Sequence, residues 1–305
     1  MHPLLNVFFG VPAAQSILNA SSVTGGDMTP IGWVEYFLFV LGLTCDAYLF
    51  YHFILSRRNQ PWEPDLLNVG PKSWGMRELI IGAAAIVAAF ALTNLFYMLV
   101  AAMTHRDEGD LVSVIVISEV LMRIGILAVF AAFLRERGQS IIESFGLRSL
   151  SLVDGIQWGV LFGFGSLPLV QLLVLASEKL FQAVGANPSE QPIAELFATT
   201  DSRFLLVLLV FFAVVIAPVF EEALFRGFAY PVLKQRFGVW RSLVIVSAVF
   251  AASHMHLPSV APLFVFAIGL GLSYELTGSL LVPITMHALF NAVMVTQLIF
   301  ERSQP

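Results

Sequence analysis

Three short blocks in the last third of the chain carry protonatable side chains within otherwise apolar sequence. Glu221 and Glu222 lie in VFEEALFRGF, His254 lies in VFAASHMHLP, and His287 lies in ITMHALFNAV. An ionisable group at membrane depth costs about 3 kcal/mol on insertion scales, so it is a functional-site hypothesis by default. Carboxyl and imidazole groups act as acids, bases or hydrogen-bond donors. Together they suggest a catalytic site that handles water inside a bilayer.

The spacing of the first block separates its two carboxylates. Residues four apart share a helix face, so Glu222 suits Arg226 as an ion-pair partner. Glu221 points about 140° away from Arg226 by the 3.6-residue period. One carboxylate is then tied down, and the other is available as a general base or acid. The alternative, left open by the spacing, is that these charges mark the exit of the helix into the cytoplasm.

The second and third blocks each place an imidazole at a four-residue spacing. His254 follows Phe250 by four residues, and His256 faces the other side of a helix. His287 and Asn291 are also four apart, so both can project into one cavity. Imidazole plus carboxamide suits the binding of an oxyanion. A satisfied core histidine, and a hydrogen-bonded pair that joins two spans, are the structural alternatives.

Composition places these blocks in a membrane protein. Hydrophobic residues make up 58% of the 305, charged residues 12%, and the mean hydropathy is +0.83. A soluble domain carries about 25% charged residues. The apolar runs are continuous, so we expect an all-α, polytopic helix bundle in one integral domain, residues 1–305. Residues 1–28 lack a basic n-region and are expected to form an N-terminal arm. The net charge of -5 is small and scattered, so no nucleic-acid partner is expected.

About eight membrane helices are expected, some of them broken or short. The fourth is long enough to be tilted or broken at GFGSLP, residues 163–168. Its glycines at four-residue spacing permit close helix approach. The sixth and seventh are short and are expected to form a hairpin inside the bundle. The candidate spans are 31–55, 79–104, 111–134, 152–184, 203–226, 241–256, 261–276 and 281–300, and the three glycines are Gly155, Gly159 and Gly163.

Basic residues concentrate in alternate loops. The positive-inside rule therefore puts the first, third and fifth loops in the cytoplasm. Glu221 and Glu222 then lie near the cytoplasmic end of the fifth span, and their site is expected to open towards the cytoplasm. The basic residues are Arg57, Arg58, Lys72 and Arg77 in the first loop, Arg135, Arg137 and Arg148 in the third, and Lys234, Arg236 and Arg241 in the fifth.

Other charges in the apolar runs support different hypotheses. Glu119 and Arg123 are four apart in the third span and are most simply a buried structural ion pair. Glu35, Asp46 and His52 in the first span could mark an ion path, which keeps a small transporter as an alternative. No inverted repeat supports that reading. A non-catalytic membrane scaffold is the other alternative.

The ordered combination EE-x-x-x-R, F-x-x-x-H and H-x-x-x-N, on three successive apolar segments, is more specific than any single block. It resembles the CPBP family, which contains the CAAX prenyl endopeptidases and the Abi and bacteriocin-processing proteins. The resemblance covers roughly residues 203–296, the expected catalytic core. The matching positions are Glu221, Glu222, Arg226, Phe250, His254, His287 and Asn291.

The resemblance implies an intramembrane endopeptidase. By the same resemblance, Glu221 and His254 are expected to activate a water, and His287 and Asn291 to stabilise the oxyanion. Glu222, Arg226 and Phe250 are supporting residues. The expected partners are the lipid bilayer and a hydrophobic or lipidated peptide or protein substrate, with prenylated CAAX substrates the best-known family case.

A zinc-dependent version is the main mechanistic alternative. Its ligands would be Glu221, His254 and His287. The sequence lacks HExxH, and Asn is a poor zinc ligand, so catalysis without a metal or other cofactor is favoured. Ser253 is an unattractive nucleophile, because adjacent side chains on a helix diverge.

Overall fold

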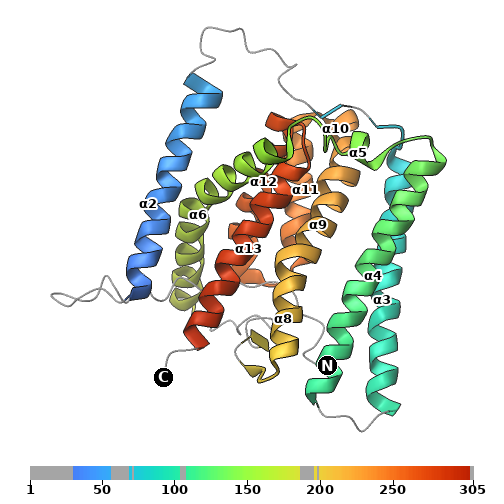
Figure 1. The fold of residues 1–305 in the computed structure, drawn as a ribbon, viewed down its shortest axis with the longest axis horizontal. Coiled ribbons are helices and arrows are strands. Elements are labelled where there is room, and N and C mark those ends of the chain that lie inside the picture. The colour runs from blue at the N-terminus through green and yellow to red at the C-terminus, as the bar shows by residue number, and fades with distance from the viewer. Residues whose placement is uncertain are drawn as a thin grey trace, which may run out of the picture.

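The computed structural model describes residues 30–55, 69–70, 72–103, 108–185, 196–197 and 199–302. The expected N-terminal arm, residues 1–28, lies outside them. The described elements are all helices, as expected (Figure 1). The first half contains α2 (Pro30–Phe50), its π-helical end η2 (Tyr51–Leu55), α3 (Met76–Met103), α4 (Glu108–Glu136), α5 (Ile141–Ser144) and α6 (Leu152–Ala183). The second half contains α8 (Arg203–Phe211), η4 (Phe212–Ile216), α9 (Ala217–Glu222), η5 (Ala223–Ala229), α10 (Tyr230–Phe237), α11 (Val239–Ser253), η6 (Leu257–Ser259), α12 (Val260–Thr277) and α13 (Leu281–Arg302).

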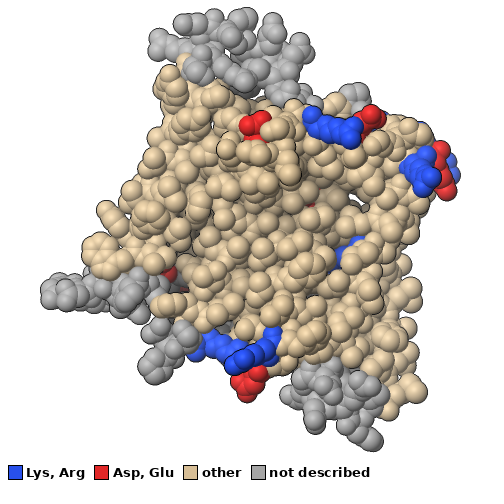
Figure 2. Space-filling model, in the orientation of Figure 1, with Lys and Arg blue, Asp and Glu red and all other residues tan. Residues whose placement is uncertain are grey.

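Seven helical segments in the described part of the chain are long and apolar enough to cross a membrane, and α11 is a shorter apolar helix. This confirms the expected bundle of about eight membrane helices. Figure 2 shows an uncharged belt with charged side chains gathered mainly at its two ends. That distribution is the one a bilayer requires, because water is absent from its core. The protein is therefore a multi-pass integral membrane protein.

Helix α6 is a central packing element, in contact with α2, α12 and α13. Gly155, Gly159 and Gly163 are buried on the face that meets α13. A Cβ on Gly159 would overlap the Thr285 side chain and lie 2.8 Å from a backbone carbonyl of α13. The glycine spacing thus allows the two backbones to approach closely, as predicted.

The predicted tilt or break at residues 163–168 is a bend without a break. Helix α6 continues through Pro168 and changes direction along its length (Figure 1). Proline removes one backbone donor and bends a helix. Gly42 of α2 packs on this point: its Cβ position lies 2.6 Å from the Phe164 carbonyl oxygen, the acceptor that the Pro168 nitrogen cannot use.

The fifth span runs from Arg203 to Phe237, which is longer than the predicted 203–226. The prediction that Glu221 and Glu222 lie near its cytoplasmic end is therefore wrong, because both lie near its middle. Two π-helical segments let the span continue through its prolines. Each is followed within two residues by a proline, Pro218 after η4 and Pro231 after η5. A π turn bonds residue i to i−5 and often marks a functional site.

Helices α11 and α12 pack against one another and are joined by residues 254–259, so the predicted hairpin forms. Only its first arm is short. The second arm, with η6, runs from Leu257 to Thr277 and is long enough to cross a membrane. The Ser177 hydroxyl on α6 donates to the Pro258 carbonyl at 2.7 Å and holds the connection against the bundle.

The parts of the basic loops that the structure describes meet at one end of the molecule. Lys234 Nζ donates to the Val69 carbonyl and to Glu275 Oε1, both at 2.7 Å, and links the first loop to α12. Lys72 Nζ donates to the Ser144 carbonyl and so links the first loop to α5. Burial and the nearby Lys234 charge lower the pKa of Lys72. These contacts place the three loops on one side, and the cytoplasmic identity of that side stays a prediction.

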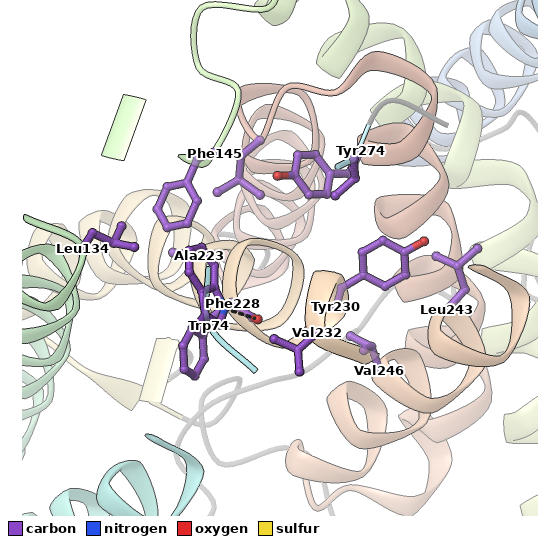
Figure 3. Packing of buried hydrophobic residues seen from close by; sticks show 12 residues of the cluster. Trp74, Leu134, Phe145, Ala223, Phe228, Tyr230, Val232, Leu243, Val246 and Tyr274 are labelled. Carbon is purple, nitrogen blue, oxygen red and sulfur yellow. Dashed lines mark hydrogen bonds between the residues drawn. The ribbon is translucent and has the colours of Figure 1, made fainter. Parts of the chain in front are cut away.

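Trp74 anchors the first loop within the same end. Its indole N–H donates to the Phe228 carbonyl of η5 at 3.1 Å, drawn as a dashed line in Figure 3. The Trp74 and Phe228 rings stack with centroids 5.9 Å apart. Nearby, the Tyr230 hydroxyl donates to Glu275 Oε1 at 2.6 Å. The loop between α2 and α3 is thus part of the core at this end.

Candidate active site

Glu222 is a buried carboxylate with partners on two helical spans. It lies on α9 and is fully buried. Its Oε1 accepts from Arg226 at 3.0 Å and from His287 Nδ1 at 2.8 Å. The predicted Glu222–Arg226 pair is confirmed, and the bond to His287 adds a second helix. Arg226 also donates to the Ala267 carbonyl of α12 at 2.8 Å. Glu222 and Arg226 together therefore link this span, at α9 and η5, to α12 and α13.

Glu221 is held less tightly, as its helical position predicts. It is 5% exposed, and its Oε2 accepts no hydrogen bond from the described residues. Among the described residues, the nearest nitrogen of a basic side chain to Glu221 Oε2 is His287 Nε2, at 4.0 Å. That separation is too long for a direct hydrogen bond. A water placed to one side could contact both atoms at normal distances.

The Glu222 bond determines which nitrogen of His287 faces Glu221. A carboxylate oxygen only accepts, so Nδ1 carries a hydrogen and donates. Nε2 is then the atom available on the Glu221 side. If His287 is neutral, Nε2 accepts a hydrogen bond; if it is an imidazolium, Nε2 donates one. The Phe266 ring packs edge-on against the imidazole, with centroids 5.7 Å apart, and restricts its orientation.

His254 caps the end of α11 and is 6% exposed. Its Nδ1 bonds the Phe250 carbonyl at 2.7 Å, so Nδ1 donates and Nε2 keeps the lone pair. The Phe250 ring lies between the functional groups: its centroid is 4.6 Å from that of His254 and 5.8 Å from that of His287. The Arg226 guanidinium stacks on the same ring at 4.8 Å. Phe250 is thus a spacer that both imidazoles contact.

Asn291 has a contact that sequence reasoning missed. Its amide donates to the Ala213 carbonyl of η4 at 2.8 Å. In the π turn, the N–H five residues after Ala213 would be its partner, but that residue is Pro218, which has no N–H. A side chain from a neighbouring helix often satisfies a carbonyl freed in this way. The presence of Pro218 was the available signal.

The structure thus brings Glu221, Glu222, Arg226 and His287 together and places His254 next to them across Phe250. Asn291 contacts the same span at Ala213, eight residues before Glu221. His256 lies apart from this group, with Nδ1 2.7 Å from the Ser259 hydroxyl.

The first-span polar residues contribute to a different interface. Asp46 packs on α6 at Gly165, whose Cβ position is 2.7 Å from the carboxylate oxygen. His52 lies against Trp158, with ring centroids 4.9 Å apart. Both belong to the α2–α6 contact, on a helix that does not supply the candidate site.

The zinc alternative requires three ligands to converge. No three His, Cys, Asp or Glu side chains within the described ranges are grouped closely enough to hold a metal ion. His287 directs Nδ1 to Glu222, which leaves only its Nε2 for a metal ion. The residues therefore do not fit the proposed Glu221, His254 and His287 ligand set. Whether catalysis is independent of metal stays a prediction.

Comparison with known proteins assigns this part of the chain. Residues 203–293 match the family model described as "Type II CAAX prenyl endopeptidase Rce1-like". That range contains the first six motif positions and Asn291. This segment is similar to the Rce1-like family. The assignment agrees with the CPBP resemblance predicted from the motifs, and the Rce1-like segment comprises α8 to most of α13.

Two relatives match part of the chain. An uncharacterized protein YpbD of Bacillus subtilis (strain 168) is 41% identical over 85 residues, which is 27% of this chain and 41% of the relative. An uncharacterized 24.3 kDa protein of Escherichia coli is 32% identical over 108 residues, which is 33% of this chain and 49% of the relative. The chain therefore spans less than half the length of each relative. No solved structure matches the chain significantly.

Proposed function

We propose that the protein is an intramembrane endopeptidase of the CAAX prenyl protease type, which hydrolyses a peptide bond with a water activated by Glu221 and His254. The observation that supports this most is that the two glutamates of the EE pair are bonded differently. Glu222 is fixed through Oε1 by Arg226 and His287, whereas Glu221 Oε2 lies buried 4.0 Å from His287 Nε2 and accepts no hydrogen bond from the described residues. A carboxylate left uncommitted in a water-poor site suits a general base.

The proposed reaction begins with a water bound between Glu221 and His254. Glu221 takes one proton as the water oxygen attacks the carbonyl carbon of the scissile bond. The proton then passes to the leaving nitrogen as the carbon–nitrogen bond breaks, so the products are a carboxylic acid and an amine. His254 supports the attack through Nε2, whose lone pair is set by the bond from Nδ1 to the Phe250 carbonyl.

The oxyanion would form on the opposite side of the carbonyl carbon. His287 can donate from Nε2 only as an imidazolium, because Nδ1 already donates to Glu222. The Glu222 carboxylate stabilises that positive charge, much as an acidic group supports the histidine of a hydrolytic triad. Asn291 has a second amide hydrogen beyond the one donated to Ala213, and this hydrogen is the proposed second donor.

The proposed substrate is a hydrophobic or lipidated peptide or protein segment that reaches the site from the bilayer or from the basic end of the bundle. Its apolar part would lie in the lipid-facing belt, and its scissile bond at the depth of Glu221. We further propose that the basic end faces the cytoplasm, by the positive-inside rule.

The test uses the full chain purified in lipid and a fluorogenic, prenylated CAAX peptide. Glu221→Gln and His254→Ala should each lower kcat by about 10²- to 10⁴-fold, the usual contribution of a general base. The matched control is His256→Ala, two residues from His254 but bonded to Ser259, which should cleave at the wild-type rate. Unaltered cleavage in both site variants would show that the assignment of the site is wrong. Cleavage that requires stoichiometric zinc would favour the metalloprotease alternative.

A further inference from the structure

Arg123 is a buried cation on α4, outside the Rce1-like residues 203–293. Its side chain is 3% exposed and pairs with Glu119 one turn earlier on the same helix. The sequence supports a structural ion pair as the simplest interpretation. A pair made within one helix does not by itself explain where the guanidinium is placed relative to the neighbouring helices.

The rings around Arg123 give that placement. Its guanidinium carbon lies 5.0 Å from the Phe90 centroid on α3, 4.8 Å from that of Phe212 in η4, and 5.4 Å from that of Phe220 on α9. Arginine favours such sites, because its weakly hydrated planar group stacks on aromatic faces. Helix α4 contacts η4, α8 and α9 beside it in Figure 1. The cation therefore holds the α3–α4 pair against the span that carries the candidate base.

Phe220 immediately precedes Glu221, so the Arg123 guanidinium packs on the ring of the residue next to the candidate base. The EE pair thus has a second guanidinium beside it, in addition to Arg226. The arrangements differ: Arg226 bonds Glu222 directly, whereas Arg123 bonds its own Glu119. Arg123 can therefore act on Glu221 by its field and by fixing α9, without neutralising the base in a direct ion pair.

We propose that Arg123, with Glu119, is a positioning residue for Glu221: docked on Phe212 and Phe220, it sets the place and the electrostatic environment of the base from outside the family segment. This inference rests on the proposed function. It implies that the α3–α4 pair is part of the catalytic machinery rather than only a neighbour in the membrane.

The test removes both charges together, as Glu119→Gln with Arg123→Gln, because a single substitution would leave an unpaired charge buried. The expected result is a fall in kcat of about 10- to 100-fold, a size typical of lost positioning, with KM changed less than about threefold. The matched control is Glu78→Gln with Arg137→Gln. That pair joins Glu78 of α3 to Arg137, the residue after α4, at 3.0 Å and lies at the basic end. It should leave kcat at the wild-type value.

Two further measurements keep the proposal refutable. Arg123→Lys retains the charge but loses the planar group that stacks on Phe212 and Phe220, so its kcat should lie between the wild-type value and that of the double variant. If the double variant does not fold, a wild-type kcat in Arg123→Lys overturns the proposal. Thermal unfolding needs no substrate. The shifts caused by the double substitution and by Glu221→Gln should be less than additive when combined, because neighbouring groups share one interaction.

The outcomes separate this inference from the function it rests on. If the wild-type protein cleaves and Glu221→Gln does not, but the double variant keeps the wild-type kcat, Arg123 has no positioning role. If the wild-type protein cleaves nothing, the proposed function fails, and the unfolding experiment alone judges Arg123. Additive unfolding shifts would then refute its coupling to Glu221.

Discussion

Replacing Glu222 by Gln should destabilise the protein severely while preserving its shape. The carboxylate accepts from Arg226 and His287 through one oxygen, and no part of Glu222 is exposed. The substitution leaves the fully buried Arg226 guanidinium without an anion. Loss of one partner of a buried pair costs about 3–5 kcal/mol. Two charge-assisted hydrogen bonds at about 1.5–3 kcal/mol each give a similar total.

This loss is a large share of an ordinary folding free energy of about 5–15 kcal/mol. It is measured as the change in unfolding free energy in denaturant, with the wild-type protein in the same detergent. The informative companion is Glu222→Gln with Arg226→Met, which removes the orphaned charge as well. It should recover more than half of the lost stability, because a buried pair replaced by packed apolar groups is often neutral.

The reasoning fails if Glu222→Gln unfolds at the wild-type denaturant concentration, or if the double substitution is less stable than the single one. Either result would mean that Arg226 is compensated by something other than Glu222. The kcat of Glu222→Gln gives a second test. Glu222→Gln should lower kcat in the folded protein, because the neutral amide no longer stabilises an imidazolium at His287.

Three other perturbations test separate parts of the structure. Gly159→Ala should lower the unfolding free energy by about 1–3 kcal/mol, because its Cβ would overlap Thr285; the control Gly125→Ala meets nothing within 4 Å and should be neutral in the same melt. Trp74→Phe should cost about 1–3 kcal/mol in denaturant unfolding, because the buried Phe228 carbonyl loses its donor, and equal stability would refute the anchoring of the first loop. Metal chelators should leave peptide cleavage unchanged, and inactivation restored by zinc would contradict the metal-independent reaction.

The features predicted correctly from sequence are those set by local geometry. The Glu222–Arg226 pair follows from a four-residue spacing, and the approach of α6 to α13 follows from glycines at the same period. Membrane helices follow from long apolar runs, since backbone groups in lipid must bond internally. The order of the three motif blocks predicted a family that the comparison with known proteins supports for residues 203–293.

The features that were not predicted depend on tertiary contacts or on irregular helix. Nothing local indicates that Glu222 also binds His287, which is 65 residues away. The fifth span was expected to end at residue 226, with the charged Arg226 as its last residue, but it continues through Pro231 to Phe237. In the structure the charge is paired, and a π segment precedes the proline, so the helix continues. The roles of Glu221, His254, His287 and Asn291 stay predictions that need kinetics.

The π segment η4 has a consequence for how this span tolerates change in length. A π turn holds about one residue more than an α turn, and one residue of α-helix corresponds to 100° of rotation. Deleting a single residue between 212 and 216 would allow ordinary α-helix to form there, and the downstream carboxylates would keep nearly the same direction, because the π turn already takes up one extra residue. Both glutamates would then still face the helices that they contact now. Deleting a residue from the regular helix after η4 has no such compensation and would turn both carboxylates by about 100°.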